Sequence, residues 1–394
     1  MTEAVIVDAV RTAGGKRNGK LKDWHPAALA AEVLKALEER NNLDPELVDD
    51  VIMGCVMQVG EQSLNIGRNA VLAAGWPESV PATTVDRQCG SSQQSMHFAA
   101  QGVIAGAYDV VVAAGVEVMT RTPMGASVVQ GMGFPFPQAQ LDRYADTGLP
   151  PQGIGAEMIA EEYGLTRDDL DAFGAQSQQR AAIARDEGRF DNEIIPIVVD
   201  LDGTKEEFRS DEGIREGTTS ETLAKLKPAF KEDGSITAGN SSQISDGASG
   251  VLIMSKEKAE ELGVKPRARF HAFAVAGTDP VTMLKGPIPA TRKILEKTGM
   301  SIDDIDLFEV NEAFASVVLA WQKEFDVDMS KVNVNGGAIA LGHPLGGSGA
   351  KLMATMLNEL ERTGGRYGLQ TMCEGGGMAN ATIIERITDE GAAG

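Results

Sequence analysis

Three short segments of this chain carry residues suited to covalent acyl chemistry. Residues 84–92 read Thr-Val-Asp-Arg-Gln-Cys-Gly-Ser-Ser and hold Cys89. Residues 335–344 read Asn-Gly-Gly-Ala-Ile-Ala-Leu-Gly-His-Pro and hold His343, and residues 373–377, Cys-Glu-Gly-Gly-Gly, begin with Cys373. We expect each thiol or imidazole to lie in a glycine-rich bend where an apolar run gives way to a small-residue helix. A thiol is a soft nucleophile and an imidazole can accept its proton, so the pattern predicts acyl transfer with a second thiol as acid/base.

Each of these residues also has a simpler interpretation. A lone cysteine is often core filling, which we favour for Cys55. Cys89 precedes a helical pattern, and the positive end of a helix would favour its thiolate. The glycines around His343 leave it few packing partners. Those after Cys373 could free backbone N–H groups for an oxyanion hole, or could form a turn beside an incidental thiol. Asn311 either caps a helix or holds a catalytic water.

Composition narrows the class of protein. The 394 residues are 42% hydrophobic, and the formal net charge of −21 argues against a nucleic-acid partner. An anionic ligand would therefore need a local patch of cations. Three cysteines are too few for a disulfide framework, and the four isolated histidines lack metal-ligand spacing. We expect no metal, no membrane span and no signal peptide, and therefore a cytoplasmic location.

The order of predicted elements repeats across an insertion. The first copy has strands at 3–10, 48–54 and 109–115, with helices at 27–40, 65–74 and 91–105. The second has strands at 268–276, 305–310 and just before Cys373, with helices at 290–298, 313–323 and 347–360. Alternating strands and helices predict an α/β fold with mostly parallel, helix-covered sheets. In this alignment Cys89 and His343 fall at equivalent bends, and 115–117 corresponds to 373–375.

Residues from about 118 to 250 interrupt the repeat. They contain Met119, Met124, Met132 and Met158, the run Phe-Pro-Phe-Pro at 134–137 and a predicted helix at 167–187. An insertion of this length is typical of a lid or a substrate wall. The alternative is an ordinary subdomain that packs its methionines inward.

Together these motifs resemble the thiolase family, the acetyl-CoA C-acyltransferases. The resemblance runs from Val-Asp-Ala-Val-Arg-Thr at 7–12 to Cys-Glu-Gly-Gly-Gly-Met-Ala-Asn-Ala at 373–381, and includes Asn-Glu-Ala-Phe-Ala at 311–315. It implies a five-layered α-β-α-β-α core of two similar βαβαβαββ halves plus an inserted loop domain. The implied boundaries are 1–117 with 251–265 returning to it, 118–250 for the loop domain, and 266–394. It also implies homodimers or homotetramers.

The resemblance assigns roles by position. It implies that Cys89 is the acylated nucleophile, that His343 activates it, and that Cys373 moves protons between acetyl-CoA and the leaving CoA. It also implies that Asn311 holds a water that forms one oxyanion hole with His343, while the N–H groups of Cys89 and Gly375 form the other. CoA and its thioesters are then substrates, with no permanently bound cofactor. The CoA groove would be lined by Arg215, Thr222, Phe230, Ala238, Ser242 and Phe314.

Two departures from the family pattern bear on substrate size. Pro151-Gln152 replaces the His-Met pair of short-chain biosynthetic thiolases, and Ser92 occupies a position that is often glycine. The motifs around Cys89 and Cys373 are closer to a subgroup that includes steroid side-chain degrading thiolases, which suggests a bulkier 3-ketoacyl-CoA. The alternatives are a short-chain acetoacetyl-CoA-forming acetyltransferase, a β-ketoacyl synthase, which would lack the second thiol, and a catalytically dead thiolase-like binding protein.

Overall fold

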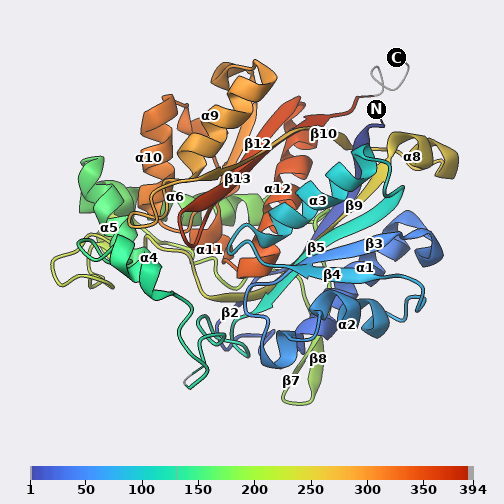
Figure 1. Cartoon of the computed structure of the whole chain (residues 1–394), viewed down its shortest axis with the longest axis horizontal. Helices are drawn as coiled ribbons and strands as arrows, with labels where there is room; N and C mark the ends of the chain where they lie inside the picture. The colour runs from blue at the N-terminus through green and yellow to red at the C-terminus, as the bar shows by residue number, and fades with distance from the viewer. Residues whose placement is uncertain (1, 130, 389–394) are drawn as a thin grey trace.

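The computed structural model describes residues 2–129 and 131–388, and Figure 1 shows two halves with the same order of elements. The first half comprises β1 (Ala4–Thr12), β2 (Gly15–Lys16), α1 (Pro26–Asn41), β3 (Asp50–Gly54), α2 (Ile66–Ala73), β4 (Ala82–Val85), α3 (Ser91–Ile104), β5 (Val110–Val118) and β9 (Ser245–Ser255). The second half, after α8 (Lys256–Leu262), comprises β10 (Ala268–Gly277), α9 (Pro287–Thr298), β11 (Leu307–Val310), α10 (Ala315–Phe325), α11 (Ala338–Leu341), α12 (Ser348–Thr363), β12 (Tyr367–Glu374) and β13 (Met378–Arg386). The predicted repeat is therefore confirmed, with ends that move by a few residues.

The strands of the two halves run in mirrored order. The path is β11-β12-β13-β10 in the second half, followed by β1-β9-β5-β3-β4 in the first. The halves join through a short antiparallel pairing of β1 with β10, at Val5 with Arg269 and Ile6 with Ala268. In the second half the counterpart of β4 is reduced to a single bridge between Phe308 and Val332.

The helices form three layers around these strands. α3 and α12 pack on each other and on strands of both halves, so they make the middle layer. Its core includes Met96 and Val103 from α3 and Met353 and Leu357 from α12. α1 and α2 cover the outer face of the first half and α9 that of the second, with α10 packed on α9. The result is the predicted five-layered α-β-α-β-α core.

The two central helices approach closely at their N-termini because the residues there are small. A Cβ built on Gly349 would lie 2.2 Å from the backbone nitrogen of Gln93, so no larger residue fits at that crossing. Ser92 Oγ accepts a hydrogen bond of 3.0 Å from the backbone N–H of Ala350. Ser92 therefore joins α3 to α12 and is not a cavity-lining residue. The segments that carry Cys89 and His343 lie just before these two helix starts.

The inserted segment is mostly packed against the core. It contains α4 (Gln138–Arg143), α5 (Gln152–Glu162), α6 (Arg167–Asp186), β6 (Ile194–Ile195), β7 (Ile197–Leu201), β8 (Thr204–Phe208) and α7 (Ser220–Leu223). α6 confirms the helix predicted at 167–187, and it packs on α10 and α11. Met119 is buried, whereas Met124 and Met132 are exposed, so the methionines do not all pack inward. In the described part of the chain, no helix is long and apolar enough to cross a membrane.

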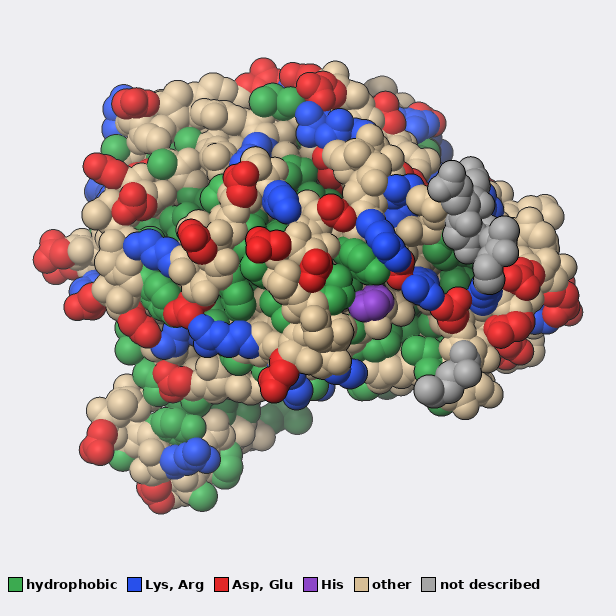
Figure 2. All heavy atoms as spheres, turned by 90° about the horizontal axis from the view of Figure 1, so that it is seen from above, with side chains coloured by type: hydrophobic (Ala, Val, Ile, Leu, Met, Phe, Trp, Pro, Cys, Tyr) green, Lys and Arg blue, Asp and Glu red, His purple; other side chains and the backbone are tan. Residues whose placement is uncertain are grey.

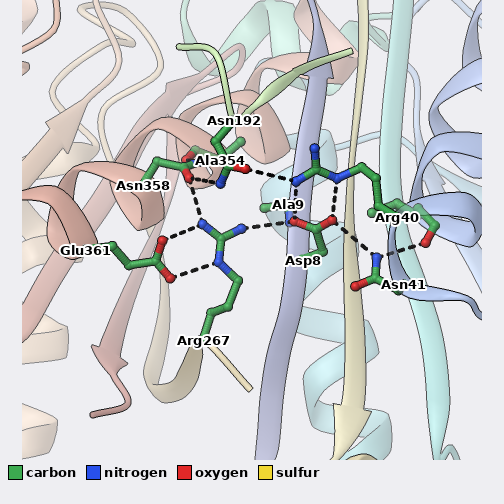
Figure 3. A network of polar contacts seen from close by, with 10 residues as sticks. Asp8, Ala9, Arg40, Asn41, Asn192, Arg267, Ala354, Asn358 and Glu361 are labelled. Atoms are coloured by element: carbon green, nitrogen blue, oxygen red, sulfur yellow. Dashed lines mark hydrogen bonds and ion pairs between the residues drawn. The ribbon is translucent and has the colours of Figure 1, made fainter. Parts of the chain in front are cut away.

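A polar network ties the halves together on one side of the fold (Figure 3). Asp8 of β1 accepts hydrogen bonds from Arg40 Nε at 2.7 Å and from Arg267 Nη1 at 3.0 Å. Arg267 also donates to Glu361 Oε2 at 2.6 Å and to Asn358 Oδ1 at 2.7 Å, both on α12. Arg267 directly precedes β10, so the network fixes the passage between the halves to both α1 and α12.

The predicted domain boundaries remain a prediction. β9 begins at Ser245, inside the range assigned to the insertion, and it pairs with β1 and β5 of the first half. The strand that returns to the first half is therefore longer than the sequence pattern indicated.

Candidate active site

The bend between β4 and α3 presents Cys89 directly ahead of the helix. Gln88 has a φ of +47°, which is unusual for a residue with a side chain, and its backbone N–H donates to Asp86 Oδ1 at 2.7 Å. Ser91 Oγ accepts from the N–H of Arg87 and donates to the carbonyl of Gln88. These bonds hold a sharp strand-to-helix turn of the kind that exposes a nucleophile. The bend predicted at Cys89 is confirmed.

The thiol of Cys89 lies among apolar side chains. It is 5% exposed and belongs to a cluster with Val56, Met57, Met119, Leu345, Leu352 and Met372. Burial and the nearby charge of Glu374 raise the pKa of Cys89 to about 12. Burial, the larger of the two causes, therefore opposes the thiolate that the helix end favours, and the preference for a thiolate at Cys89 stays a prediction. Cys89 needs a base to take its proton.

His343 has the geometry of that base. Its Nδ1 lies 2.5 Å from Ser348 Oγ, and that hydroxyl donates its proton to the carbonyl of Pro344 at 2.8 Å. Since Ser348 has one proton, it must accept from Nδ1–H, which leaves Nε2 unprotonated. Burial, with the charge of Lys351, lowers the pKa of His343 to about 3. The neutral ring therefore has an unprotonated Nε2 that can accept a proton.

The backbone before His343 requires glycine. Gly342 has a φ of +83°, and a Cβ there would lie 2.2 Å from Ser245 Oγ. The next N–H, that of His343, donates to the carbonyl of Gln243 at 3.1 Å. These contacts with the segment entering β9 fix the direction in which the imidazole points.

Asn311 lies beside the histidine and does not cap a helix. Its Nδ2 is 3.5 Å from His343 Nε2, while its Oδ1 is buried without a partner. α10 begins at Ala315 with Phe314 as its cap residue, so the interpretation of Asn311 as a helix cap is wrong. The Oδ1 of Asn311 is therefore available to a ligand or a water.

Cys373 is buried within β12 and pairs with Ala379 of β13, so the predicted glycine-rich bend at this thiol is wrong. The bend follows two residues later, at 375–377 in the β12–β13 hairpin. There Gly375 touches Gln88, since a Cβ on it would lie 2.9 Å from Gln88 Oε1. Burial and the neighbouring Cys89 raise the pKa of Cys373 well above its usual value. Cys55, by contrast, is buried in the core of the first half, as expected.

A cavity of about 660 Å³ leads to this group of residues. Met119 and Leu345 line it and also pack with Cys89, and His343 lies in its wall. The remaining lining residues are Lys16, Arg17, Met124, Gln152, Arg215, Ala229, Phe230, Ala238, Ser241, Ser242, Gln243, Ile244, Ala313 and Phe314. Five of the six predicted CoA contacts are among them. Thr222 does not line the cavity, and it forms a capping box with Thr219 at the start of α7.

The charged residues that line this cavity differ in balance from those on the face shown in Figure 2. Figure 2 shows a face on which acidic and basic side chains are intermixed. The charged residues that line the cavity are Lys16, Arg17 and Arg215, all of them basic. Lys16 and Arg17 were not predicted. They lie after β1 and far from the other lining residues in sequence, so only the expectation of a local cation patch pointed towards them.

The aromatic wall depends on a glycine at the start of α5. A Cβ on Gly153 would lie 2.2 Å from the Phe230 ring, so the ring packs directly on the helix backbone. Phe230 also meets Phe314 edge to face, with ring centroids 5.8 Å apart. Gln152 lies next to this pair in the cavity lining, whereas Pro151 does not line the cavity. Only one residue of the predicted Pro-Gln pair therefore borders the space.

Comparisons with known proteins identify the family of this chain. Residues 4–257 match the family model "Thiolase, N-terminal domain" and residues 264–386 match "Thiolase, C-terminal domain". The chain is 52% identical to "Steroid 3-ketoacyl-CoA thiolase FadA6" of Mycobacterium tuberculosis, over 98% of this chain and 95% of that protein. It is 45% identical to "Acetyl-CoA acetyltransferase" of Chromobacterium violaceum, over 98% and 100% of the two chains. The crystal structure of the Bacillus anthracis acetyl-CoA acetyltransferase superposes with a TM-score of 0.90 at 40% identity, covering 98% of this chain and 99% of that one. The chain belongs to the thiolase family and is an acyltransferase.

Proposed function

We propose that this thiolase cleaves 3-ketoacyl-CoA with CoA, to give acetyl-CoA and a shortened acyl-CoA, through an acyl group on Cys89. The reverse Claisen condensation uses the same groups. One cavity is the observation that carries the proposal. Its charged lining residues are basic, and His343 lies in its wall. Two of its lining residues, Met119 and Leu345, pack against Cys89. Such a cavity suits an anionic thioester with its reacting carbon at the inner end.

In the first half-reaction Cys89 Sγ attacks the 3-keto carbonyl, and its proton passes to His343 Nε2. The C2–C3 bond then breaks, leaving the acyl group on Cys89, and its electron pair becomes the enolate of acetyl-CoA. Cys373 Sγ gives its proton to that enolate. The raised pKa of Cys373 makes it a thiol at neutral pH, which is the form that this step needs.

In the second half-reaction CoA gives its thiol proton to the Cys373 thiolate and attacks the acyl carbonyl. Cys89 leaves and recovers its proton from His343, so both thiols return to their starting state. We propose two oxyanion holes. A water held by Asn311 beside His343 stabilises the negative charge on the thioester oxygen of acetyl-CoA. The N–H groups of Cys89 and Gly375 stabilise the negative charge on the acyl oxygen. The unpartnered Oδ1 of Asn311 and the contact of Gly375 with Gln88 support these assignments.

The cavity lining supports CoA as the second substrate. Arg215, Lys16 and Arg17 supply positive charge for its phosphates, and Phe230, Ala238, Ser242 and Phe314 supply the predicted wall. Thr222 remains a predicted contact. No step in this chemistry requires a permanently bound cofactor.

We propose that the acyl group is larger than acetoacetyl, from a fatty acid or a steroid side chain. Gln152 gives the wall an unbranched, flexible side chain, and Met119 and Met124 can adapt to varied apolar shapes. The name of the Mycobacterium tuberculosis relative, a steroid 3-ketoacyl-CoA thiolase, favours this choice, whereas the two acetyltransferases favour a short acyl chain.

We also propose a homodimer or homotetramer in the cytoplasm. The segment after β5 exposes Met132 by 82% and Phe134 by 64%, which is apolar area suited to a subunit contact. Two catalytic thiols must stay reduced, which suits the cytoplasm. Light scattering of the purified protein tests the assembly.

Thiolysis of a series of 3-ketoacyl-CoA esters tests the proposed function. We expect kcat/KM to rise from acetoacetyl-CoA to medium-chain or cyclic substrates. If acetoacetyl-CoA is clearly the best substrate, the chain is a short-chain acetyltransferase. If no ester is cleaved and no condensation is detected, the proposed activity is wrong.

A further inference from the structure

Glu374 is a buried carboxyl group directly behind the proposed nucleophile. Its side chain is fully buried, and neither carboxyl oxygen has a hydrogen-bond partner. A Cβ built on Gly90, the residue after Cys89, would lie 2.1 Å from Glu374 Oε1 and 2.7 Å from Asn380 Nδ2. The carboxyl group therefore lies against the backbone that carries Cys89. A buried carboxyl without donors is costly in its charged form and needs an explanation.

The other half of the molecule contains a matched carboxyl group. Glu117 and Glu374 are each the eighth residue of their strands, β5 and β12, which follow equivalent helices. The predicted alignment of 115–117 with 373–375 is thus one residue out of register. Glu117 is fully supplied with donors: the backbone N–H groups of Val56, Met57 and Gly346, and the side-chain amide of Gln62. It holds the fold of the first half together, and Glu374 lacks such a role.

The groups that face Glu374 come from both sides of the site. Asp86 and Arg87 belong to the bend before Cys89, and Arg87 Nε is itself buried without a partner. Cys89 and Cys373 are the two thiols that its charge acts upon. Burial raises the pKa of Glu374 to about 8, with Arg87 lowering it and Asp86 raising it. At neutral pH the group therefore carries a proton.

We propose that Glu374 is a positioning residue that must be neutral for catalysis, and that its ionisation opposes thiolate formation at Cys89 and Cys373. The proposal rests on the roles assigned above to the two thiols. A neutral carboxyl next to Cys89 lets His343 withdraw the thiol proton without creating two adjacent negative charges. Once Glu374 loses its proton, a fixed negative charge in an apolar setting raises the energy of either thiolate. Thiol reactivity, which normally increases with pH, should level off instead.

Alkylation of Cys89 by iodoacetamide between pH 7 and pH 10 tests this inference, with the labelled peptide measured by mass spectrometry. We expect wild-type protein and Glu374→Gln to react at similar rates at pH 7. At pH 9 the Gln variant should react about tenfold faster, since one unit of thiol pKa corresponds to a tenfold change in thiolate. Glu374→Leu should behave like the Gln variant, and Glu374→Asp, which keeps the charge, should resemble the wild type.

The inference would be overturned if the rate of Cys89 alkylation rose with pH in the same way in the wild type, Glu374→Gln and Glu374→Leu. Equal changes in the Gln and Asp variants would also overturn it, because they would indicate a packing role. Acetylation of the wild-type protein by acetyl-CoA separates this failure from that of the proposed function. If Cys89 is acetylated but the pH dependence of its alkylation is the same in the wild type and the variants, only the role of Glu374 is refuted. If Cys89 is not acetylated, the proposed function is refuted.

Discussion

The imidazole of His343 is oriented by Ser348, whose Oγ lies 2.5 Å from Nδ1 and whose own proton goes to the carbonyl of Pro344. One hydroxyl thereby selects the tautomer in which Nε2 is unprotonated. Both residues are almost fully buried, so water does not compete for the ring nitrogen. A base in a thiolase needs such a fixed tautomer, because the proton of a thiol with a raised pKa must be taken at one defined atom.

Ser348→Ala should lower kcat for thiolysis about 10-fold to 100-fold and change KM little, because the ring loses its tautomer and orientation while the cavity is unchanged. Steady-state kinetics measures kcat and KM separately. Ser95→Ala is the matched control, since Ser95 is also a buried helical serine but bonds only to the carbonyl of Ser91. Equal losses in both variants would mean that Ser348 acts through folding alone.

Arg215→Ala should raise KM for CoA about tenfold, with a smaller change in kcat, because it removes a cation from the cavity without touching the reacting carbon. The effect should shrink as salt is raised from 0.05 to about 0.5 M, where charge interactions are screened. Arg209→Ala serves as the control, since Arg209 is exposed and pairs with Glu207. A salt-independent loss, or an equal loss in Arg209→Ala, would contradict the proposed phosphate contact.

Gln152→Trp should lower kcat/KM for long 3-ketoacyl-CoA esters more than for acetoacetyl-CoA, because it narrows the cavity beside Phe230. Each methylene that is no longer buried costs about 0.8 kcal/mol, or about fourfold in kcat/KM. The neighbouring Pro151→Ala should leave the chain-length preference as it is, since Pro151 does not line the cavity. A uniform loss across chain lengths would place the acyl group elsewhere.

The stability of the fold should fall with acidification partly through His97. Burial, with the charges of Arg87 and Lys297, lowers the pKa of His97 to about 3 from 6.5. Below pH 6.5 the unfolded chain binds a proton that the folded chain does not, so stability is lost as pH falls from 6.5 towards 3. Down to pH 5 this amounts to at most about 2 kcal/mol.

Urea unfolding at pH 7, 6 and 5 measures this contribution. The loss of unfolding free energy between pH 7 and 5 should be smaller in His97→Gln than in the wild type, whatever the stability of the variant at pH 7. Identical pH slopes would show that His97 is not kept neutral by the fold.

Much of the architecture could be predicted from local pattern. β5 is buried along its whole length and has no charged residue before Glu117, and α3 and α12 follow bends rich in small residues. The position of Cys373 inside a strand was harder to predict from the sequence. A hairpin with three glycines resembles a strand-to-helix bend until its partner strand β13 is known.

The electrostatics of the site could not be predicted from sequence. The proton affinity of Cys89 depends on Glu374, which is distant along the chain and reaches Gly90 only through the packing of β12 behind α3. Likewise, Lys16 at the end of β2 and Arg17 after it are far from Arg215 in sequence, and only the fold brings them to the same cavity. Thr222 bonds to Thr219, the N-cap residue of α7, a short-range interaction that the family resemblance did not indicate.

The central claim is that Cys89 carries the acyl group while Cys373 serves the carbon–carbon step. The direct test is intact-mass and peptide mass spectrometry of Cys373→Ala after incubation with acetyl-CoA. We predict one acetyl adduct per chain, mapped to Cys89, together with a loss of thiolysis by about 100-fold or more. An adduct on Cys55, or no adduct on a chain that still cleaves 3-ketoacyl-CoA, would contradict the account.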